Sequence, residues 1–198
     1  MRALLDSLTL EQKVGQLFLI RCPQENEAQA IACFQPAGLV LFSVDFENRT
    51  AEEVRARIVG MQESSPLPLL ISADEEGGTV CRVSRQPALR DKKFPSPREL
   101  YAAGGWEAVE QDAREKAALL RNLGLNVNLA PVCDISQNPN AFMYHRSLGA
   151  DPITTGAYVT GTLERMAENG VGGVMKHFPG YGENGDTHTG QVIDTRTL

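Results

Sequence analysis

The amino-acid sequence alternates short apolar runs with helical patterns, and this alternation restricts the fold more than any other feature. The longer runs are AGLVLFS at residues 37–43, LPLLISAD at 67–74, VNLAPVCDI at 127–135 and VGGVMKHF at 171–178, and a brief run at 17–20 precedes them. Short apolar runs with polar ends are typical of strands buried in a parallel sheet. We therefore predict strands at these positions.

Helical patterns separate the runs. Capping-box sequences begin at Thr9 and Thr50, a third helical pattern covers residues 105–122 before Gly124, and a fourth begins at Asp151-Pro152. Strands that alternate with helices predict an α/β fold with a mostly parallel sheet covered on both faces. Right-handed crossovers leave two architectures, an open doubly wound sheet or a barrel. No nucleotide-binding glycine motif follows any strand.

Length and charge exclude several classes of protein. The 198 residues fall short of the roughly 250 that a complete eight-unit β/α barrel takes. The net charge is −6, from 25 acidic and 19 basic residues. An acidic chain of this kind is not suited to bind the phosphate backbone of a nucleic acid. We therefore expect no nucleic-acid binding.

Cysteine spacing and hydropathy indicate the compartment. The four cysteines are widely spread and form no C-x-x-C pair, which is typical of free thiols in a reducing compartment. The N-terminal segment shows no signal-peptide pattern, and no apolar run reaches the ~18 residues of a membrane span. We expect a cytoplasmic protein, unless an export signal has been removed, and no membrane span.

Charged residues follow the predicted strands, at the edge where parallel α/β folds bind ligands. One run ends at Asp74, within DEEGG, and Arg82 follows eight residues later. The last run delivers Lys176 and His177. An acidic triplet is usually a solvated turn, but its place after a strand favours binding, and its glycines would let the backbone approach a ligand closely. Arg146 could hold hydroxyls or a carboxylate through its fork of donors.

A second candidate group lies in the glycine-rich segment that follows. Asp186 can accept a hydrogen bond from one imidazole nitrogen of His188, two residues away, and raise the basicity of the other nitrogen. Such a histidine suits a general acid that later acts as a base. A zinc site of His177, Asp186 and His188 is the alternative, but it matches no standard spacing, and the neighbouring Lys176 opposes it. We expect neither a metal nor a cofactor.

Several segments, taken in order, make the chain resemble the N-terminal catalytic domain of glycoside hydrolase family 3, and within it the β-N-acetylglucosaminidases. They are LTLEQKVGQLF, AGLVLF, DEEGGTVCRV, LNVNLAPVCDI, RSLG, KHFPGYG and DTH. KHFPG followed by a D-[ST]-H loop is the most specific. The resemblance implies a (β/α)8 TIM-type barrel, of which residues 1–198 would be a partial catalytic domain with roughly the first five β/α units.

The same resemblance implies a role for each matching residue. Asp74 would hydrogen-bond the sugar hydroxyls at the non-reducing-end subsite, with Arg82 beside it. The remaining hydroxyls would be held by Arg146, Lys176 and His177. These five residues would bind a carbohydrate substrate.

The catalytic residues implied by the resemblance are His188, as the general acid/base, and Asp186, which orients it. This dyad distinguishes the N-acetylglucosaminidases from β-glucosidases of the same family, which take a glutamate from a separate C-terminal domain. Two positions depart from the family pattern: Tyr181 replaces a second histidine in K-H-F-P-G-H-G, and DEEGG replaces D-Q-E-G-G.

The nucleophile is missing from the matching residues. Retaining glycosidases need a second group about 5–5.5 Å from the acid/base. In the family this group is an aspartate from a later strand, which would lie beyond Leu198. Asp194 is the only acid after the dyad, and nothing places it at a strand end. We expect this chain alone to be inactive.

The leading hypothesis is a retaining glycosidase that removes β-linked N-acetylglucosamine from cell-wall fragments, as in peptidoglycan recycling, or from amino-sugar oligosaccharides. A phosphorylase using the same dyad is an alternative, because a neutral histidine repels phosphate less than a carboxylate does. A β-glucosidase is another. If Leu198 is the natural end, a non-catalytic sugar-binding remnant is a third, and its open barrel edges would favour self-association.

Overall fold

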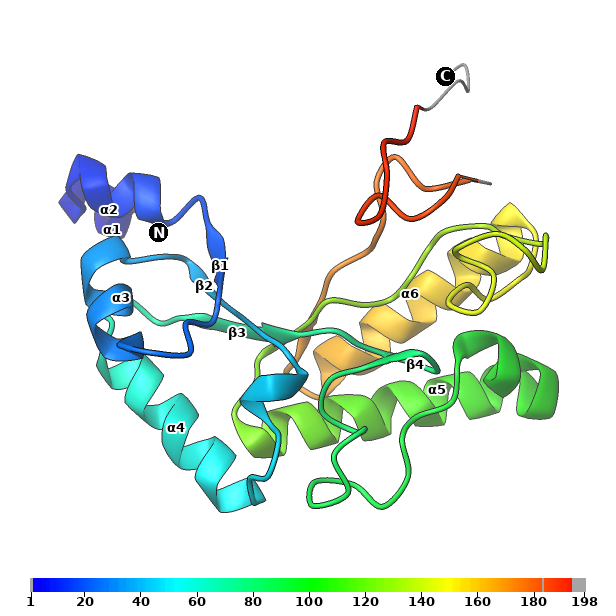
Figure 1. The fold of residues 1–198 in the computed structure, drawn as a ribbon, viewed down its shortest axis with the longest axis horizontal. Helices are drawn as coiled ribbons and strands as arrows, with labels where there is room; N and C mark the ends of the chain where they lie inside the picture. The colour runs from blue at the N-terminus through cyan, green and yellow to red at the C-terminus, as the bar shows by residue number, and fades with distance from the viewer. Residues whose placement is uncertain (1, 183, 194–198) are drawn as a thin grey trace.

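A parallel sheet of five strands forms the centre of the computed structural model, which describes residues 2–182 and 184–193. The strand order is β1-β2-β3-β6-β7, and all neighbouring pairs are parallel. Figure 1 shows β1, β2 and β3 side by side. The strands are β1 Leu19–Arg21, β2 Gly38–Leu41, β3 Leu70–Ala73, β6 Val127–Asn128 and β7 Gly172–Gly173. Each step along the sheet crosses over through a helix, so the predicted α/β class is confirmed.

The crossovers are made by α3 Glu27–Phe34, α4 Ala51–Glu63, α5 Pro97–Leu123 and α6 Pro152–Glu168, while α1 Arg2–Ser7 and α2 Leu10–Gly15 precede the sheet. A short 3-10 helix, η1 Ser43–Asp45, follows β2, and an antiparallel hairpin, β4 Glu75–Gly77 and β5 Val80–Cys81, follows β3. Figure 1 shows α5 and α6 lying side by side. No helix in the described ranges is long and apolar enough to cross a bilayer.

Four of the predicted helix ends are confirmed. Thr9 and Thr50 both form complete capping boxes at the starts of α2 and α4. Asp151 accepts from two backbone N–H groups at the start of α6, where Pro152 takes the first helical position. Gly124 ends α5 with a φ of 95°, a left-handed conformation that glycine adopts without steric cost.

Three boundaries differ from the prediction, and one of them is the run at 171–178, which is a strand only over Gly172–Gly173. α5 begins at Pro97, capped by Ser96, and is interrupted by a kink at Gly104 and Gly105, whereas the periodicity predicts a start near residue 105. The run at 127–135 is a strand only over Val127–Asn128. Pro131 has no N–H to donate to a ladder, and beyond it only an isolated bridge joins Val132 to Lys176.

The core lies where the sheet packs on α4 and α5. Two apolar side chains of each central strand are fully buried, Leu39 and Leu41 in β2 and Ile71 and Ala73 in β3. They pack with side chains from the two helices, namely Val54, Ile58, Met61, Ala117, Leu120 and Leu123. Because strand side chains alternate between the two faces, this packing fixes the register of the sheet and the position of the residues that follow each strand.

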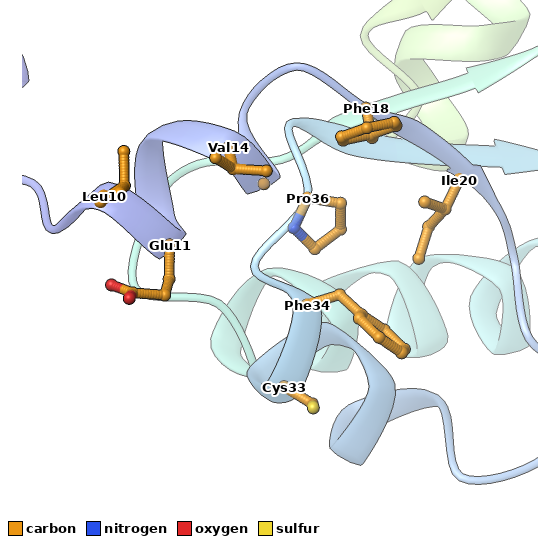
Figure 2. A pocket seen from close by; sticks show the side chains of 9 residues that line it. Leu10, Glu11, Val14, Phe18, Ile20, Cys33, Phe34 and Pro36 are labelled. Carbon is orange, nitrogen blue, oxygen red and sulfur yellow. The ribbon is translucent and has the colours of Figure 1, made fainter.

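The sheet is not closed into a barrel within the described residues, since β1 pairs only with β2, and β7 only with β6. Beside β1, an apolar groove of about 550 Å³ lies between α2 and α3 (Figure 2). Its lining includes Leu10, Val14, Phe18, Ile20, Phe34 and Pro36. The Phe34 residue is 63% exposed. Contiguous apolar surface of this kind is typical of a binding face.

Candidate active site

Asp74 and Lys176 meet at the carboxyl ends of the strands. Asp74 is the first residue after β3, and Lys176 follows β7 in the stretch that bridges to Val132. The Lys176 Nζ lies 2.5 Å from Oδ1 of Asp74 and 2.6 Å from Oε1 of Glu76. The ammonium is therefore held between two carboxylates.

Arg146 joins this cluster through Glu76. Its Nε and Nη2 donate to the two carboxylate oxygens of Glu76 at 2.9 and 2.7 Å, a bidentate pair. The two side chains are 13% and 1% exposed. Burial lowers the pKa of Arg146, but the hydrogen bonds and charge of Glu76 outweigh it, so the pKa lies above its usual value. Arg146 is thus a fixed, charged donor.

His177 is held by Asp134, which lies at the polar end of the 127–135 run. The Asp134 Oδ2 accepts from the His177 backbone N–H at 3.0 Å and lies 2.7 Å from the ring Nδ1. The His177 Nε2 lies 3.4 Å from Nη2 of Arg146. Burial raises the pKa of Asp134, but the hydrogen bonds from His177 and Tyr181 outweigh it and hold the pKa below its usual value. The ionised carboxylate favours a proton on Nδ1, which leaves Nε2 as an acceptor.

Arg82 lies near the carboxylate oxygen of Asp74 that Lys176 does not contact. The Arg82 Nε is 3.7 Å from Oδ2 of Asp74. Its guanidinium also stacks over the ring of Phe42, 5.5 Å from the centroid. The five predicted sugar-binding residues are therefore linked through Asp74, Glu76 and the Arg146–His177 contact.

The acidic triplet is not the solvated turn that such sequences usually form. Glu75 and Glu76 are 0% and 3% exposed. Glu75 accepts hydrogen bonds from the backbone and hydroxyl of Ser84. A Cβ on Gly77 would lie 2.1 Å from the carbonyl oxygen of Pro95, and φ there is +102°. The structure thus gives Gly77 a packing role against the segment before α5.

A buried ion pair on α5 holds the backbone of the acidic triplet Asp74-Glu75-Glu76. The Lys116 Nζ lies 2.5 Å from Oδ2 of Asp112 and donates to the backbone carbonyl of Glu76 at 2.8 Å. The side chains of Lys116 and Asp112 are 6% and 8% exposed. Burial raises the pKa of Asp112, although the Lys116 charge opposes the rise. This pair fixes the backbone of Glu76 from the helix side.

Asp186 and His188 form the hydrogen bond that their spacing predicts. The Asp186 Oδ1 lies 2.7 Å from Nδ1 of His188 and accepts from the His188 backbone N–H at 2.9 Å. These two bonds, backbone first, hold the pKa of Asp186 below its usual value. The His188 side chain is 82% exposed. Its Nε2 is therefore accessible, as a group that exchanges protons with a ligand must be.

Tyr181 connects the charged cluster at the strand ends with the Asp186–His188 pair. Its backbone N–H donates to Oδ1 of Asp134 at 2.7 Å, and its hydroxyl lies 2.8 Å from Oγ1 of Thr187, between the dyad residues. A cavity of about 380 Å³ borders the same segment, lined by residues that include Asp134, His177 and Gly182.

Glu76 and Asp134 are the functional residues that the sequence did not single out. Both are buried carboxylates that hold predicted binding residues in place. The signal for Asp134 was its position at the polar end of an apolar run, and Glu76 lay inside the acidic triplet. Asp194 lies outside the described residues. His145 lies in a turn, beside the ring of Tyr144.

The described part of the chain contains no group of three or more His, Cys, Asp or Glu side chains that could hold a metal ion. His177 pairs with Asp134, and His188 with Asp186. The three residues of the zinc alternative thus lie in two separate pairs.

A comparison with known proteins identifies relatives over almost the whole chain. The model of the glycosyl hydrolase family 3 N terminal domain matches residues 9–198. Beta-hexosaminidase LpqI of Mycobacterium tuberculosis is 35% identical over 187 residues, 93% of this chain and 47% of that protein. A beta-hexosaminidase of Stenotrophomonas maltophilia is 34% identical over 170 residues, 82% of this chain and 48% of that protein. The chain spans about half the length of these curated relatives.

Solved structures of relatives share the fold. The structure of M. tuberculosis LpqI has a TM-score of 0.77 and 30% identity, over 91% of this chain and 51% of that one. A glycoside hydrolase family 3 beta-N-acetylglucosaminidase from Paenibacillus sp. has a TM-score of 0.80 and 30% identity, over 91% of this chain and 35% of that one. The parallel sheet and its crossover helices are therefore the first part of the family barrel. The chain belongs to glycosyl hydrolase family 3 and carries its N-terminal domain.

Proposed function

We propose that the chain is part of the catalytic domain of a retaining β-N-acetylglucosaminidase. The enzyme would remove β-linked N-acetylglucosamine from the non-reducing end of cell-wall fragments or amino-sugar oligosaccharides. The observation that carries the proposal is the joining of a charged cluster at the strand ends to an exposed His–Asp pair. The relatives that bear the names beta-hexosaminidase and beta-N-acetylglucosaminidase support it.

The cluster has the chemistry of a sugar subsite. Asp74 offers carboxylate oxygens to hydroxyl donors, and Lys176 offers ammonium donors to hydroxyl oxygens. Arg146 offers the guanidinium edge that Glu76 leaves free, and His177 offers Nε2. Arg82 extends the donor set on the other side of Asp74. Because these charges already hold one another, the site is preorganised before a sugar arrives.

His188 would perform the proton transfers. Its Nε2 would donate a proton to the departing glycosidic oxygen and then take one from the attacking water. Asp186 would hold the proton on Nδ1 and stabilise the imidazolium that forms during the cycle. The nucleophile would be an aspartate from a later strand of the family barrel, so we propose that the 198-residue chain binds sugar without turning it over.

The test is His188→Ala in the complete protein, measured with aryl β-N-acetylglucosaminides whose leaving groups differ in pKa. A poor leaving group needs protonation, so its release should fall by about 10²-fold or more, whereas an activated nitrophenyl leaving group should be much less affected. His145→Ala is the matched control and should change neither rate. Unchanged turnover of the poor leaving group in His188→Ala would refute the acid/base assignment.

Added phosphate distinguishes hydrolysis from phosphorolysis. A hydrolase releases free N-acetylglucosamine at the same rate with and without phosphate. Release of the sugar 1-phosphate, only when phosphate is present, would support the phosphorylase alternative. Turnover of aryl β-glucosides in place of the N-acetylated substrates would support the β-glucosidase alternative.

We also propose that the 198-residue chain self-associates through the open β1 edge and the apolar groove beside it, with a second copy as the occupant. The unpaired edge and the groove are continuous, since Ile20 belongs to β1 and also lines the groove. An open strand edge next to apolar surface favours pairing with another chain. The acidic net charge supports the proposal that nucleic acid is not among the partners. We also propose a cytoplasmic location, which the spacing of the cysteines supports.

A further inference from the structure

We propose that Tyr181 is a positioning residue that latches the Asp186–His188 dyad onto the sugar-binding cluster. The proposal rests on the proposed function of these residues. The hydroxyl of Tyr181 lies 2.8 Å from Oγ1 of Thr187, the residue between the two members of the dyad. This hydrogen bond joins the stretch that delivers Lys176 and His177 to the stretch that would transfer protons.

Tyr181 is fixed on the side of the sugar-binding cluster. Its backbone N–H donates to Oδ1 of Asp134 at 2.7 Å, and the other oxygen of that carboxylate holds His177. Its ring meets the ring of His177 edge-on, with centroids 4.9 Å apart at 83°. The ring of Phe142 lies 5.3 Å away on another side. The position of the hydroxyl is therefore set by the buried Asp134 and by two aromatic rings.

The dyad is held mainly by bonds within its own turn. Asp186 accepts from the backbone and the ring of His188, and its carbonyl accepts from the backbone and hydroxyl of Thr189. These bonds keep the shape of the turn but do not set where the turn lies. The contact between Tyr181 and Thr187 reaches across to the cluster, so it helps to fix the position of His188 relative to the bound sugar.

The strength of this contact suits a latch. A hydrogen bond between two partly exposed hydroxyls contributes little net free energy, so it opens and closes readily. A proton-transfer loop needs both states, one that holds the imidazole at the glycosidic oxygen and one that admits substrate and releases product. A side chain without the phenolic hydroxyl at this position could not reach Thr187 in this way. The latch is therefore a feature of the tyrosine that this chain carries.

The first test measures amide hydrogen exchange of His188 and Thr189 by NMR in the 198-residue chain. Tyr181→Phe keeps the ring contacts and removes the hydroxyl, and Thr187→Val removes the other partner. Each should speed exchange of these two amides by roughly 2- to 10-fold, the factor to which one net hydrogen bond corresponds. Thr187→Ser, which keeps a hydroxyl, should restore the slow exchange. The ring of Tyr101 packs on Trp106, away from these residues, so Tyr101→Phe is the matched control and should leave the exchange of both amides unchanged. Unchanged exchange in both latch variants would overturn the proposal.

The second test measures kinetics in the complete protein. Tyr181→Phe should lower kcat for a poor aryl leaving group by roughly 2- to 10-fold, with KM and the rate for an activated leaving group nearly unchanged. Equal slowing with both leaving groups would overturn the positioning role. If the unmodified protein cleaves no aryl glycoside, the proposed function fails, and the exchange measurement still decides whether the latch exists.

Discussion

The Arg146 guanidinium binds the Glu76 carboxylate through two hydrogen bonds, of 2.9 and 2.7 Å, across 70 residues of sequence. The same carboxylate lies 2.6 Å from Nζ of Lys176. One buried anion thus orients two of the cations proposed to bind the sugar. Because Glu76 is 3% exposed, its carboxylate faces these two side chains and not the solvent.

Glu76→Gln should lower the stability of the protein strongly, although the substitution preserves the shape of the side chain. It leaves Arg146 facing an uncharged amide in a site where Arg146 is 13% exposed. Removing one partner of a buried ion pair typically costs about 3–5 kcal/mol. We expect the free energy of unfolding in urea to fall by about 3 kcal/mol, and the binding of N-acetylglucosamine, measured by calorimetry, to weaken.

The matched control is Glu110→Gln on α5. Glu110 pairs with Arg114 at 3.0 Å, but these side chains are 42% and 40% exposed. Solvent screening limits such pairs to a few tenths of a kcal/mol, so we expect a change of about 0.5 kcal/mol at most. Similar losses in the two variants would show that Glu76 is not a buried charge partner.

Lys116→Met should destabilise the protein in a pH-dependent way. The substitution leaves Asp112 buried without its counter-ion, at a cost of about 3–5 kcal/mol near neutral pH. Burial raises the pKa of Asp112 above its unfolded value, and the loss of Lys116 removes the main opposing effect. A raised folded pKa gives stability that is present below the unfolded pKa and is lost as pH rises through the folded pKa.

The deficit of Lys116→Met relative to the unmodified chain should therefore shrink as pH falls from neutrality through the raised pKa of Asp112, because the protonated carboxyl needs no counter-ion. Urea unfolding at a series of pH values measures it. The double variant Asp112→Asn with Lys116→Met removes the titrating group and should show a deficit that varies little with pH. A deficit in the single variant that grows towards acid pH would contradict the assignment.

Asp134 should give the opposite pH dependence. Its hydrogen bonds with His177 and Tyr181 hold its pKa below the usual value despite burial. A lowered folded pKa gives stability that is present above the unfolded pKa of about 3.9 and is lost as pH falls through the folded pKa. Asp134→Asn should cost about 1–3 kcal/mol at neutral pH, and the cost should decrease below about pH 4. Asp91→Asn, at an exposed loop position, is the control for general acid effects.

The sequence predicts those parts of the fold that local chemistry determines. Three helix starts can be predicted because the motif that marks each of them lies within four residues. They are the capping boxes at Thr9 and Thr50 and the cap at Asp151. Helix α3 lacks such a signal: Asn26 precedes it in a left-handed conformation, with no side-chain cap bond. The start of α5 carries a capping box at Ser96, but the surrounding Pro, Lys and Arg residues favour a loop interpretation.

The candidate site divides in the same way. Asp74, Lys176 and His177 are predictable, because the carboxyl ends of parallel strands converge and these residues follow strands. The Asp186–His188 bond is predictable because its partners are two residues apart. The partners Glu76 and Asp134 are not, because 70 and 43 residues separate them from Arg146 and His177. Only the folded sheet brings them together.

Phe34→Glu should weaken self-association of the 198-residue chain. Phe34 lines the groove between α2 and α3 and is 63% exposed, so the monomer should fold normally. A second copy seated on the groove would bury the new carboxylate without a partner, which is strongly unfavourable. We expect sedimentation of the unmodified chain to depend on concentration, and Phe34→Glu to raise the association midpoint by about tenfold or more, equivalent to ~1.4 kcal/mol. Ile153→Glu, at an 85% exposed apolar residue on α6, is the control and should leave the midpoint unchanged. Equal shifts in both variants would place the interface elsewhere, and an unmodified chain that stays monomeric at all concentrations would end the proposal.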